Sequence, residues 1–191
     1  MTTWGVNSTH DSSHDSSHDS SQDARYTEAA AEYGAALERL ARAYEADADR
    51  RRDLLQEIHL ALWRSFAAWN GACSMRTWLY RVAHNTAASY VIRERRDRSR
   101  ELLSVEDLES AADPTAPEAA AGDRQALDRL LSLVQALKPI DRQVILSYLE
   151  GLDAASISEI TGLSAVNVAT KIHRIKKVLA RKFHQGVPHA E

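Results

Sequence analysis

The sequence predicts an all-α protein of two small helical domains joined by a flexible acidic linker. Gly and Pro are scarce, at 7 and 4 residues of 191, whereas the strong helix formers Ala, Leu and Arg are abundant. No stretch shows the alternation of polar and β-branched residues that is typical of a half-buried strand. Apolar residues recur instead at steps of three or four, which is the period of a helix with one buried face. A chain of this length supports one or two modest cores, and two small helical units fit the pattern best.

The two ends of the chain are expected to be tails. Residues 1–24 carry the repeat HDSSHDSSHDSS, which has almost nothing to bury and is predicted to be disordered; residues 186–191 form the second tail. His10, His14 and His18 are of a metal-ligating type, but a flexible tract loses entropy when it binds and no further residue completes a fixed site. We therefore expect no metal site, no cofactor and no catalytic residue.

Residues 25–100 form the first predicted domain, with three amphipathic helices. The first covers 25–47 and the second 49–69, and Ser74 is the predicted N-cap of the third. The inward stripes of the first two helices are Tyr26, Ala30, Tyr33, Leu37, Leu40 and Tyr44, then Leu54, Leu55, Ile58, Leu62, Phe66 and Trp69. A short loop made of Asn70, Gly71, Ala72 and Cys73 breaks the helical pattern before Ser74.

The third helix concentrates positive charge, aromatic rings and amides. Its inward stripe is predicted to be Met75, Trp78, Leu79, Val82, Thr86 and Tyr90. That leaves Arg76, Tyr80, Arg81, His84, Asn85 and Ser89 toward solvent or a partner. From Arg76 to Arg100 there are seven arginines against Glu94 and Asp97, on a chain whose net charge is −3. A solvated face that suits the helix dipole is one interpretation. Because amides read base edges and aromatic rings stack on unpaired bases, contact with nucleic acid is the other.

Residues 101–123 contain seven acidic residues and no basic one, with Pro114, Pro117 and an Ala-rich run. This composition predicts a linker, most simply a flexible tether.

Residues 124–185 form the second predicted domain, which ends in a helix-turn-helix. One helix ends before Pro139 and a second at Gly151; a third reaches Gly162, and Ser164 caps the last. On that last helix Val168, Ile172, Ile175 and Leu179 are expected to face the core. The residues left for base edges are Asn167, Thr170, Lys171, His173 and Arg174, and those left for phosphates are Lys176, Lys177 and Arg181.

Three stretches resemble one protein family. TWLYRVAHNTA, from Thr77 to Ala87, resembles region two of the extracytoplasmic-function sigma factors, the small promoter-recognition subunits of bacterial RNA polymerase. RDLLQEI, from Arg52 to Ile58, is similar to the segment with which that family binds the coiled coil of the largest polymerase subunit. The helix-turn-helix resembles the family's region four. The resemblance covers about residues 26–183, with both modules in family order.

The resemblance implies three sets of functional residues. The set for recognition and melting of the minus-ten element is Asn70, Gly71, Cys73, Arg76, Tyr80, Arg81, His84 and Asn85. The set for core polymerase binding is Asp53, Gln56 and Glu57, for which a solvated charged face is the alternative. The set for the minus-thirty-five element is Asn167, Thr170, Lys171, His173, Arg174, Lys176, Lys177 and Arg181. For the acidic linker it implies occupation of positively charged polymerase channels.

We therefore expect an alternative sigma factor that binds core RNA polymerase and promoter DNA, regulated, as the resemblance implies, by an anti-sigma factor. A stand-alone helix-turn-helix regulator is the alternative. No phosphate-cradling Gly-rich loop, HExxH pair or Cys-pair spacing suggests an enzyme. No apolar run approaches the ~18 residues of a membrane span, and the N-terminus lacks the order of a signal peptide. The lone Cys73 fits a reducing compartment, so a cytoplasmic protein without membrane insertion is expected.

Overall fold

A computed structural model of the chain describes residues 13–95, 103–110 and 122–185. These residues are predominantly helical, with no strand among them, which confirms the predicted all-α class. The helices are α1 (Ser13–Tyr44), α2 (Ala48–Ser65), α3 (Met75–Arg95), α4 (Val105–Ser110), α5 (Asp123–Ala136), α6 (Pro139–Leu149), α7 (Ala154–Thr161) and α8 (Ala165–Gln185). No helix of the described ranges is both long and apolar enough to span a bilayer.

Helices α1, α2 and α3 form the first unit. Their shared core contains the fully buried Leu37, Leu54, Ile58 and Leu79. Asp47 is the N-cap of α2. Its carboxylate accepts hydrogen bonds from the backbone N–H groups of Asp49 and Arg50, each at 3.1 Å. The prediction that Ser74 caps the third helix is confirmed by the bond from the Thr77 N–H to Ser74 Oγ, at 3.1 Å.

Helices α5 to α8 form the second unit, and its caps follow the sequence closely. Pro139 occupies the first turn of α6, where its missing N–H costs nothing. Gly162 ends α7 with φ of 75°, a left-handed conformation that favours glycine. Ser164 Oγ then accepts the Asn167 N–H at 3.3 Å and begins α8. The predicted helix-turn-helix of α7 and α8 is therefore confirmed as a structure.

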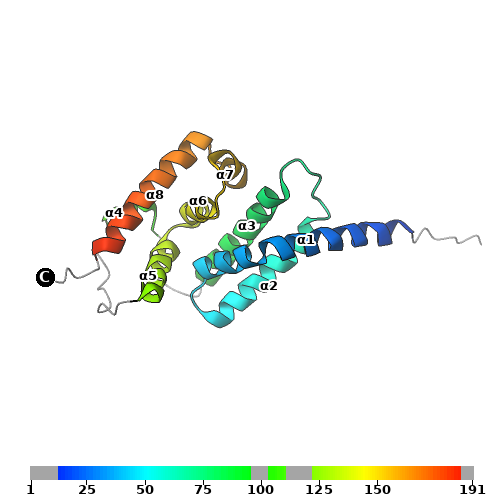
Figure 1. Ribbon diagram of the computed structural model, residues 1–191, viewed down its shortest axis with the longest axis horizontal. Coiled ribbons are helices and arrows are strands. Elements are labelled where there is room, and N and C mark those ends of the chain that lie inside the picture. Colours follow the sequence, from blue (N-terminus) through cyan, green and yellow to red (C-terminus); the bar gives the residue numbers. More distant parts are fainter. Residues whose placement is uncertain (1–12, 96–102, 111–121, 186–191) are drawn as a thin grey trace, which may run out of the picture.

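The two units are packed against each other. Figure 1 shows α6 and α7 beside α3, with α5 beside the end of α1 where α2 begins. The buried Arg142 of α6 joins them, because its Nη1 donates to Tyr44 O at 3.4 Å and its guanidinium lies 5.0 Å from the Tyr44 ring centre. Gln135 Nε2 adds a bond to Arg42 O at 2.9 Å. One continuous core results.

The structure differs from the sequence prediction at the N-terminal tail. Helix α1 begins at Ser13, so residues 13–24 are helical rather than disordered. Two bonds fasten this segment to α2: Gln22 Nε2 donates to Trp63 O at 2.8 Å, and Trp63 Nε1 donates to Asp23 Oδ1 at 2.7 Å. Because extending an existing helix is much easier than nucleating one, the preceding polar turns continue it. Residues 1–12, including His10, lie outside the described residues.

The linker also differs, because part of it is the short helix α4. Ser104 and Asp107 form a capping box: the Ser104 N–H donates to Asp107 Oδ2 at 3.0 Å, and the Asp107 N–H donates to Ser104 Oγ at 3.1 Å. Val105 and Leu108, three positions apart, are buried. The stretch with Pro114, Pro117 and the Ala-rich run lies outside the described residues.

Candidate nucleic-acid interface

The loop between α2 and α3 lies beside the first half of α3. Asn70 Oδ1 accepts the Ala72 N–H at 3.1 Å, and Gly71 has φ of 78°, so the backbone turns sharply here. Arg81 Nη2 lies 3.0 Å from Cys73 Sγ, and its guanidinium lies 5.2 Å from the Trp78 ring centre. The structure therefore brings Arg81 to the loop, as the sequence prediction requires.

Asn85 lies one helical turn beyond Arg81 on the same face of α3 and is exposed. Asn70 and Gly71 are exposed as well, while Cys73 and Arg81 are half-buried. These five residues form one surface, which we call the loop surface. It offers an amide, a guanidinium and a turned backbone within one face, a combination suited to hydrogen bonding with base edges.

His84 was predicted to face solvent or a partner, and the structure shows that this prediction is wrong. Its side chain is fully buried between the two units. The Tyr44 hydroxyl lies 3.0 Å from Nδ1, and Ser147 Oγ of α6 lies 3.1 Å from Nε2. Burial away from water disfavours the charged ring and lowers the pKa of His84 to about 3. His84 is therefore a neutral, hydrogen-bonded interface residue.

Tyr80 and Arg76 are turned to the second unit too. Tyr80 is buried, and its hydroxyl donates to Glu150 Oε2 at 3.1 Å. Burial, reinforced by the nearby Glu150 carboxylate, raises the pKa of Tyr80. Arg76 Nη2 donates to Glu150 O. A single apolar stripe predicted one buried face for α3, but the helix has a second one, built from Tyr80 and His84, that packs on α6 and α7.

Glu150 joins the units through contacts with three residues, Tyr80, Arg76 and Arg39. Arg39 of α1 donates to both of its carboxylate oxygens, from Nε at 2.8 Å and from Nη2 at 2.7 Å. The hydrogen bond from Arg39 lowers the pKa of Glu150 against the opposing effect of partial burial. Sequence reasoning missed both residues, because an isolated Arg and Glu carry no periodic signal.

The predicted polymerase-binding residues lie on the outer face of α2. Asp53 and Gln56 are exposed, and Glu57 is half-buried because it accepts a hydrogen bond from Arg93 Nη2 of α3 at 2.7 Å. The face is therefore available to a partner, with one of its three members already paired within the chain.

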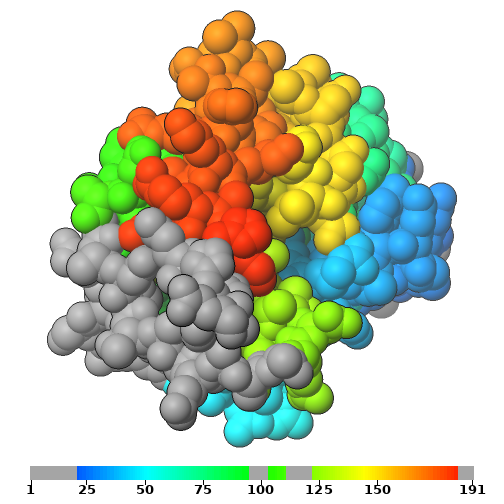
Figure 2. All heavy atoms as spheres, turned by 60° about the vertical axis from the view of Figure 1, so that its left-hand side comes forward, coloured from blue at the N-terminus to red at the C-terminus, as the bar shows by residue number. Residues whose placement is uncertain are grey.

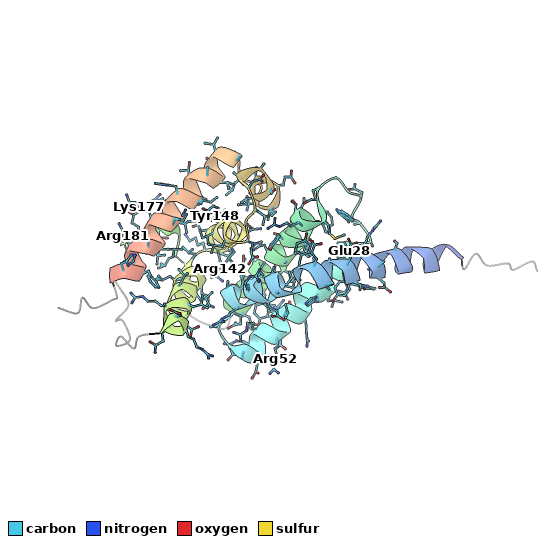
Figure 3. The ribbon with its side chains drawn as sticks, in the orientation of Figure 1. Glu28, Arg52, Arg142, Tyr148, Lys177 and Arg181 are labelled. Carbon is cyan, nitrogen blue, oxygen red and sulfur yellow. The ribbon has the colours of Figure 1, made fainter. Side chains whose placement is uncertain are left out.

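Helix α8 presents the second polar surface, shown on the near face in Figure 2. Val168, Ile175 and Leu179 are buried as predicted, and Ile172 is half-buried. The exposed members of the predicted DNA-contacting set are Asn167, Thr170, His173, Lys176 and Lys177. Figure 3 shows Lys177 and Arg181 on α8. Lys176 Nζ donates to the Tyr148 hydroxyl at 3.2 Å.

The other three members of that set are paired within the chain. Lys171 Nζ lies 2.6 Å from Asp141 Oδ1, and Asp141 is buried. Arg174 pairs with Glu106 at 2.5 Å and with Glu109 at 3.2 Å, and Arg181 pairs with Glu109 at 3.3 Å. The acidic partners on α4 were assigned to a flexible tether from the sequence, although their capping box was a usable signal.

Comparisons with known proteins match both units in chain order. A family described as Sigma-70 region 2 matches residues 30–97, and one described as Sigma-70, region 4 matches residues 127–179. The chain belongs to the sigma-70 family. The presence of both regions in this order identifies an alternative sigma factor that directs transcription initiation, and it gives no support to the stand-alone regulator.

Several relatives of this sigma factor belong to the extracytoplasmic-function group. The ECF RNA polymerase sigma-E factor of Haemophilus influenzae is 29% identical over 141 residues, which cover 69% of this chain and 73% of that protein. The sigma factor YlaC of Bacillus subtilis is 29% identical over 135 residues, covering 69% and 76%. SigG of Mycobacterium tuberculosis is 28% identical over 149 residues, which cover 66% of this chain but only 40% of SigG.

The fold of this sigma factor matches a solved structure over nearly its whole length. CnrH, in complex with the cytosolic domain of CnrY, aligns with a TM-score of 0.64 at 18% identity, covering 90% of this chain and 96% of that one. At this identity the match shows the fold alone. Sigma factors are initiation factors rather than enzymes.

Proposed function

We propose that this sigma factor binds core RNA polymerase through α2, reads the minus-ten element with the loop surface and reads the minus-thirty-five element with α8. In this assignment region 2 comprises residues 25–100 and region 4 comprises residues 124–185. Catalysis of RNA synthesis stays with the core enzyme, and the chain has no catalytic activity of its own.

The strongest support comes from α8. Its first three turns expose Asn167, Thr170 and His173, the residues that a helix-turn-helix directs at base edges in the major groove. Lys176 and Lys177 follow on the exposed face, where they can contact phosphates. Phosphate contacts fix the position of the helix, and the polar residues near its N-terminus supply the choice of sequence.

The loop surface supports capture of an unpaired base. Removing a base from the stack costs a few kcal/mol, which stacking and hydrogen bonds in a pocket can offset. Asn70 and Asn85 carry amides for a base edge, and Arg81 can contact a phosphate or a base. We leave Tyr80 and His84 out of this surface because both are buried between the units.

A pull-down with bacterial core RNA polymerase, followed by run-off transcription from the region upstream of its own gene, tests the proposal. Asn85→Ala should reduce promoter opening, followed by permanganate reactivity of unpaired thymines, and leave polymerase binding intact. Asp53→Ala combined with Gln56→Ala should reduce polymerase binding itself. Each variant is the control for the other, since both replace exposed polar side chains.

Three results would contradict these assignments. Loss of polymerase binding in Asn85→Ala would contradict the assignment of Asn85 to promoter opening. Full polymerase binding by the α2 double variant would show that Asp53 and Gln56 belong to a solvated charged face rather than to the polymerase contact. Binding of DNA by the wild type without any binding of polymerase would favour the stand-alone regulator.

We also propose a cytoplasmic location, where polymerase and DNA are found, and regulation by a protein partner of the anti-sigma kind. Extracytoplasmic-function sigma factors commonly have such regulators, and the similar fold of CnrH was solved in complex with the cytosolic domain of CnrY. Co-purification of a tagged copy from its own cells would test for such a partner, and recovery of polymerase alone would argue against it.

A further inference from the structure

Helix α4 lies against the face of α8 that we assign to promoter DNA. We propose that α4 is an internal competitor of the minus-thirty-five element: an acidic helix of the same chain that must leave α8 before DNA can occupy the whole of its reading face. The inference rests on the proposed function of α8 and adds a mode of regulation to it. Figure 2 shows α4 (green) along one edge of α8 (orange to red).

The docking of α4 begins with an apolar anchor. Val105 and Leu108 are 0% and 5% exposed, so one side of this six-residue helix is buried. Just before it, the Leu103 N–H donates to Ala136 O at 2.8 Å and Leu103 O accepts the Lys138 N–H at 2.7 Å. These two bonds fix the start of α4 to the connection between α5 and α6.

The other side of α4 supplies carboxylates to the basic residues of α8. Glu106 and Glu109 both accept hydrogen bonds from the Arg174 guanidinium, and Arg181 donates to the Glu109 side chain and backbone oxygen, each at 3.3 Å. Carboxylate and phosphate oxygens accept the same planar pattern of guanidinium N–H groups. Helix α4 therefore satisfies within the chain two arginines that DNA phosphates or bases would otherwise satisfy.

A third basic residue is held at the base of the same contact. Asp141 accepts the Val105 N–H at 3.1 Å through Oδ2 and pairs with Lys171 through Oδ1 at 2.6 Å. One buried carboxylate thus connects the first residue of α4 to α8. The groove between the two helices is lined by Val105, Glu106, Leu163, Asn167, Thr170 and Lys171, so α4 also flanks the residues assigned to base edges.

The ionic part of this contact is suited to displacement. The side chains of Arg174, Glu106, Glu109 and Arg181 are 36–50% exposed, and half-exposed ion pairs are weak and screened by salt. His173 and Lys177 remain exposed, which leaves DNA a place to begin binding. A helix of six residues is not stable alone, so α4 should unfold when it leaves α8.

Duplex binding by charge-matched variants of the full chain tests the inference. The probe is a fluorescent duplex of the promoter that gives the run-off transcript, and the readout is its anisotropy. Glu106→Gln with Glu109→Gln weakens the ionic contact and keeps the apolar anchor. Glu28→Gln with Glu32→Gln on α1 is the control, because it changes the net charge equally at exposed positions; Figure 3 shows Glu28 on the part of α1 far from α8.

The α4 variant should bind the duplex about tenfold more tightly than the control variant, given three weak ion pairs. Equal affinities of the two variants would overturn the inference, because net charge alone would then explain any gain. Lys177→Ala distinguishes the other failure. If Lys177→Ala leaves the duplex affinity of the wild type and of both variants unchanged, α8 does not bind this DNA and the proposed function fails. If it lowers the affinity of all of them, α8 binds the duplex and equal affinities refute only the role of α4.

Hydrogen exchange of the wild type gives an independent readout. The backbone amides of α4 should lose protection when saturating duplex is added, while those of α6 keep theirs. Unchanged protection of α4 in the DNA complex would show that both fit on α8 together and would overturn the competition. This measurement needs no substitution, so it holds even where a variant folds poorly.

Discussion

Acidification should destabilise this sigma factor through His84. Burial holds the pKa of His84 at about 3, whereas the unfolded chain restores its ordinary value of 6.5. The unfolded state therefore binds the extra proton between these values, so the free energy of unfolding is greatest above pH 6.5 and falls as the pH decreases toward 3. Between pH 7.5 and pH 5.5 the loss from this one group is about 1.4 kcal/mol, since the unfolded ring goes from mostly neutral to mostly charged.

The described groups around His84 offer no negative charge that would stabilise its protonated ring. Tyr44 of α1, Tyr80 of α3 and Ser147 of α6 are its neighbours, and the Arg142 cation lies over the Tyr44 ring. No described carboxylate hydrogen-bonds to the ring, and desolvation is the cause of the shift. Protonation is therefore coupled to separation of the units or to unfolding.

Urea unfolding of the wild type and of His84→Gln, at pH 7.5 and pH 5.5, checks this value. The Gln amide can accept from Tyr44 and donate to Ser147 but does not titrate. The wild type should lose about 1.4 kcal/mol more than the variant over this interval. His59, whose pKa burial also lowers, is present in both proteins and cancels. The same pH dependence in both proteins would refute the reasoning.

Three further predictions concern stability, each measured by urea unfolding. Leu37→Ala should cost ~2–5 kcal/mol, because the side chain is fully buried in the first unit; a cost under ~1 kcal/mol would place it outside the core. Gly162→Ala should cost ~1–2 kcal/mol through its left-handed φ, whereas Gly34→Ala, inside α1 with open space around it, should stabilise by ~0.5–1 kcal/mol; effects of equal sign would contradict this. Glu150→Gln should lower the free energy of unfolding by about 1 kcal/mol, a value that allows for the exposure of Arg39. Asp128→Asn should lower it by less, because both members of the Asp128–Arg42 pair are exposed; the reverse order would contradict the role of Glu150 in joining the units.

Most of the fold follows from local signals in the sequence. The stripe that contains Leu37, the caps at Ser74 and Ser164, and the stop at Gly162 each specify a helix or its end through nearby residues only. Helix period and capping are short-range properties, so one sequence is enough to read them.

The contact between the units could not be read in the same way. In the sequence, Tyr80 and His84 look like part of a polar face that is exposed or binds a partner. Their burial depends on Glu150 and Ser147, which lie more than 60 positions later in the chain. Long-range polar pairs have no period, and a buried His is indistinguishable from an exposed one in a sequence. Five of the eight residues predicted for the minus-ten element form the loop surface, because Arg81 and Asn85 are one turn apart and the loop is adjacent in the chain. The other three, Arg76, Tyr80 and His84, contact the second unit instead, and the contact of the loop surface with DNA stays a prediction.

The backbone pairing of Leu103 makes the competition at α8 an intramolecular one. Because the start of α4 is bonded to Ala136 and Lys138, the helix stays near α8 even when its carboxylates are displaced. A tethered competitor acts at an effective concentration in the millimolar range for short connections. Dilution of the protein therefore leaves its occupancy of α8 unchanged, whereas DNA competes in proportion to its own concentration. Promoter affinity should accordingly be lowered by a constant factor that the cell cannot alter by making less of the protein.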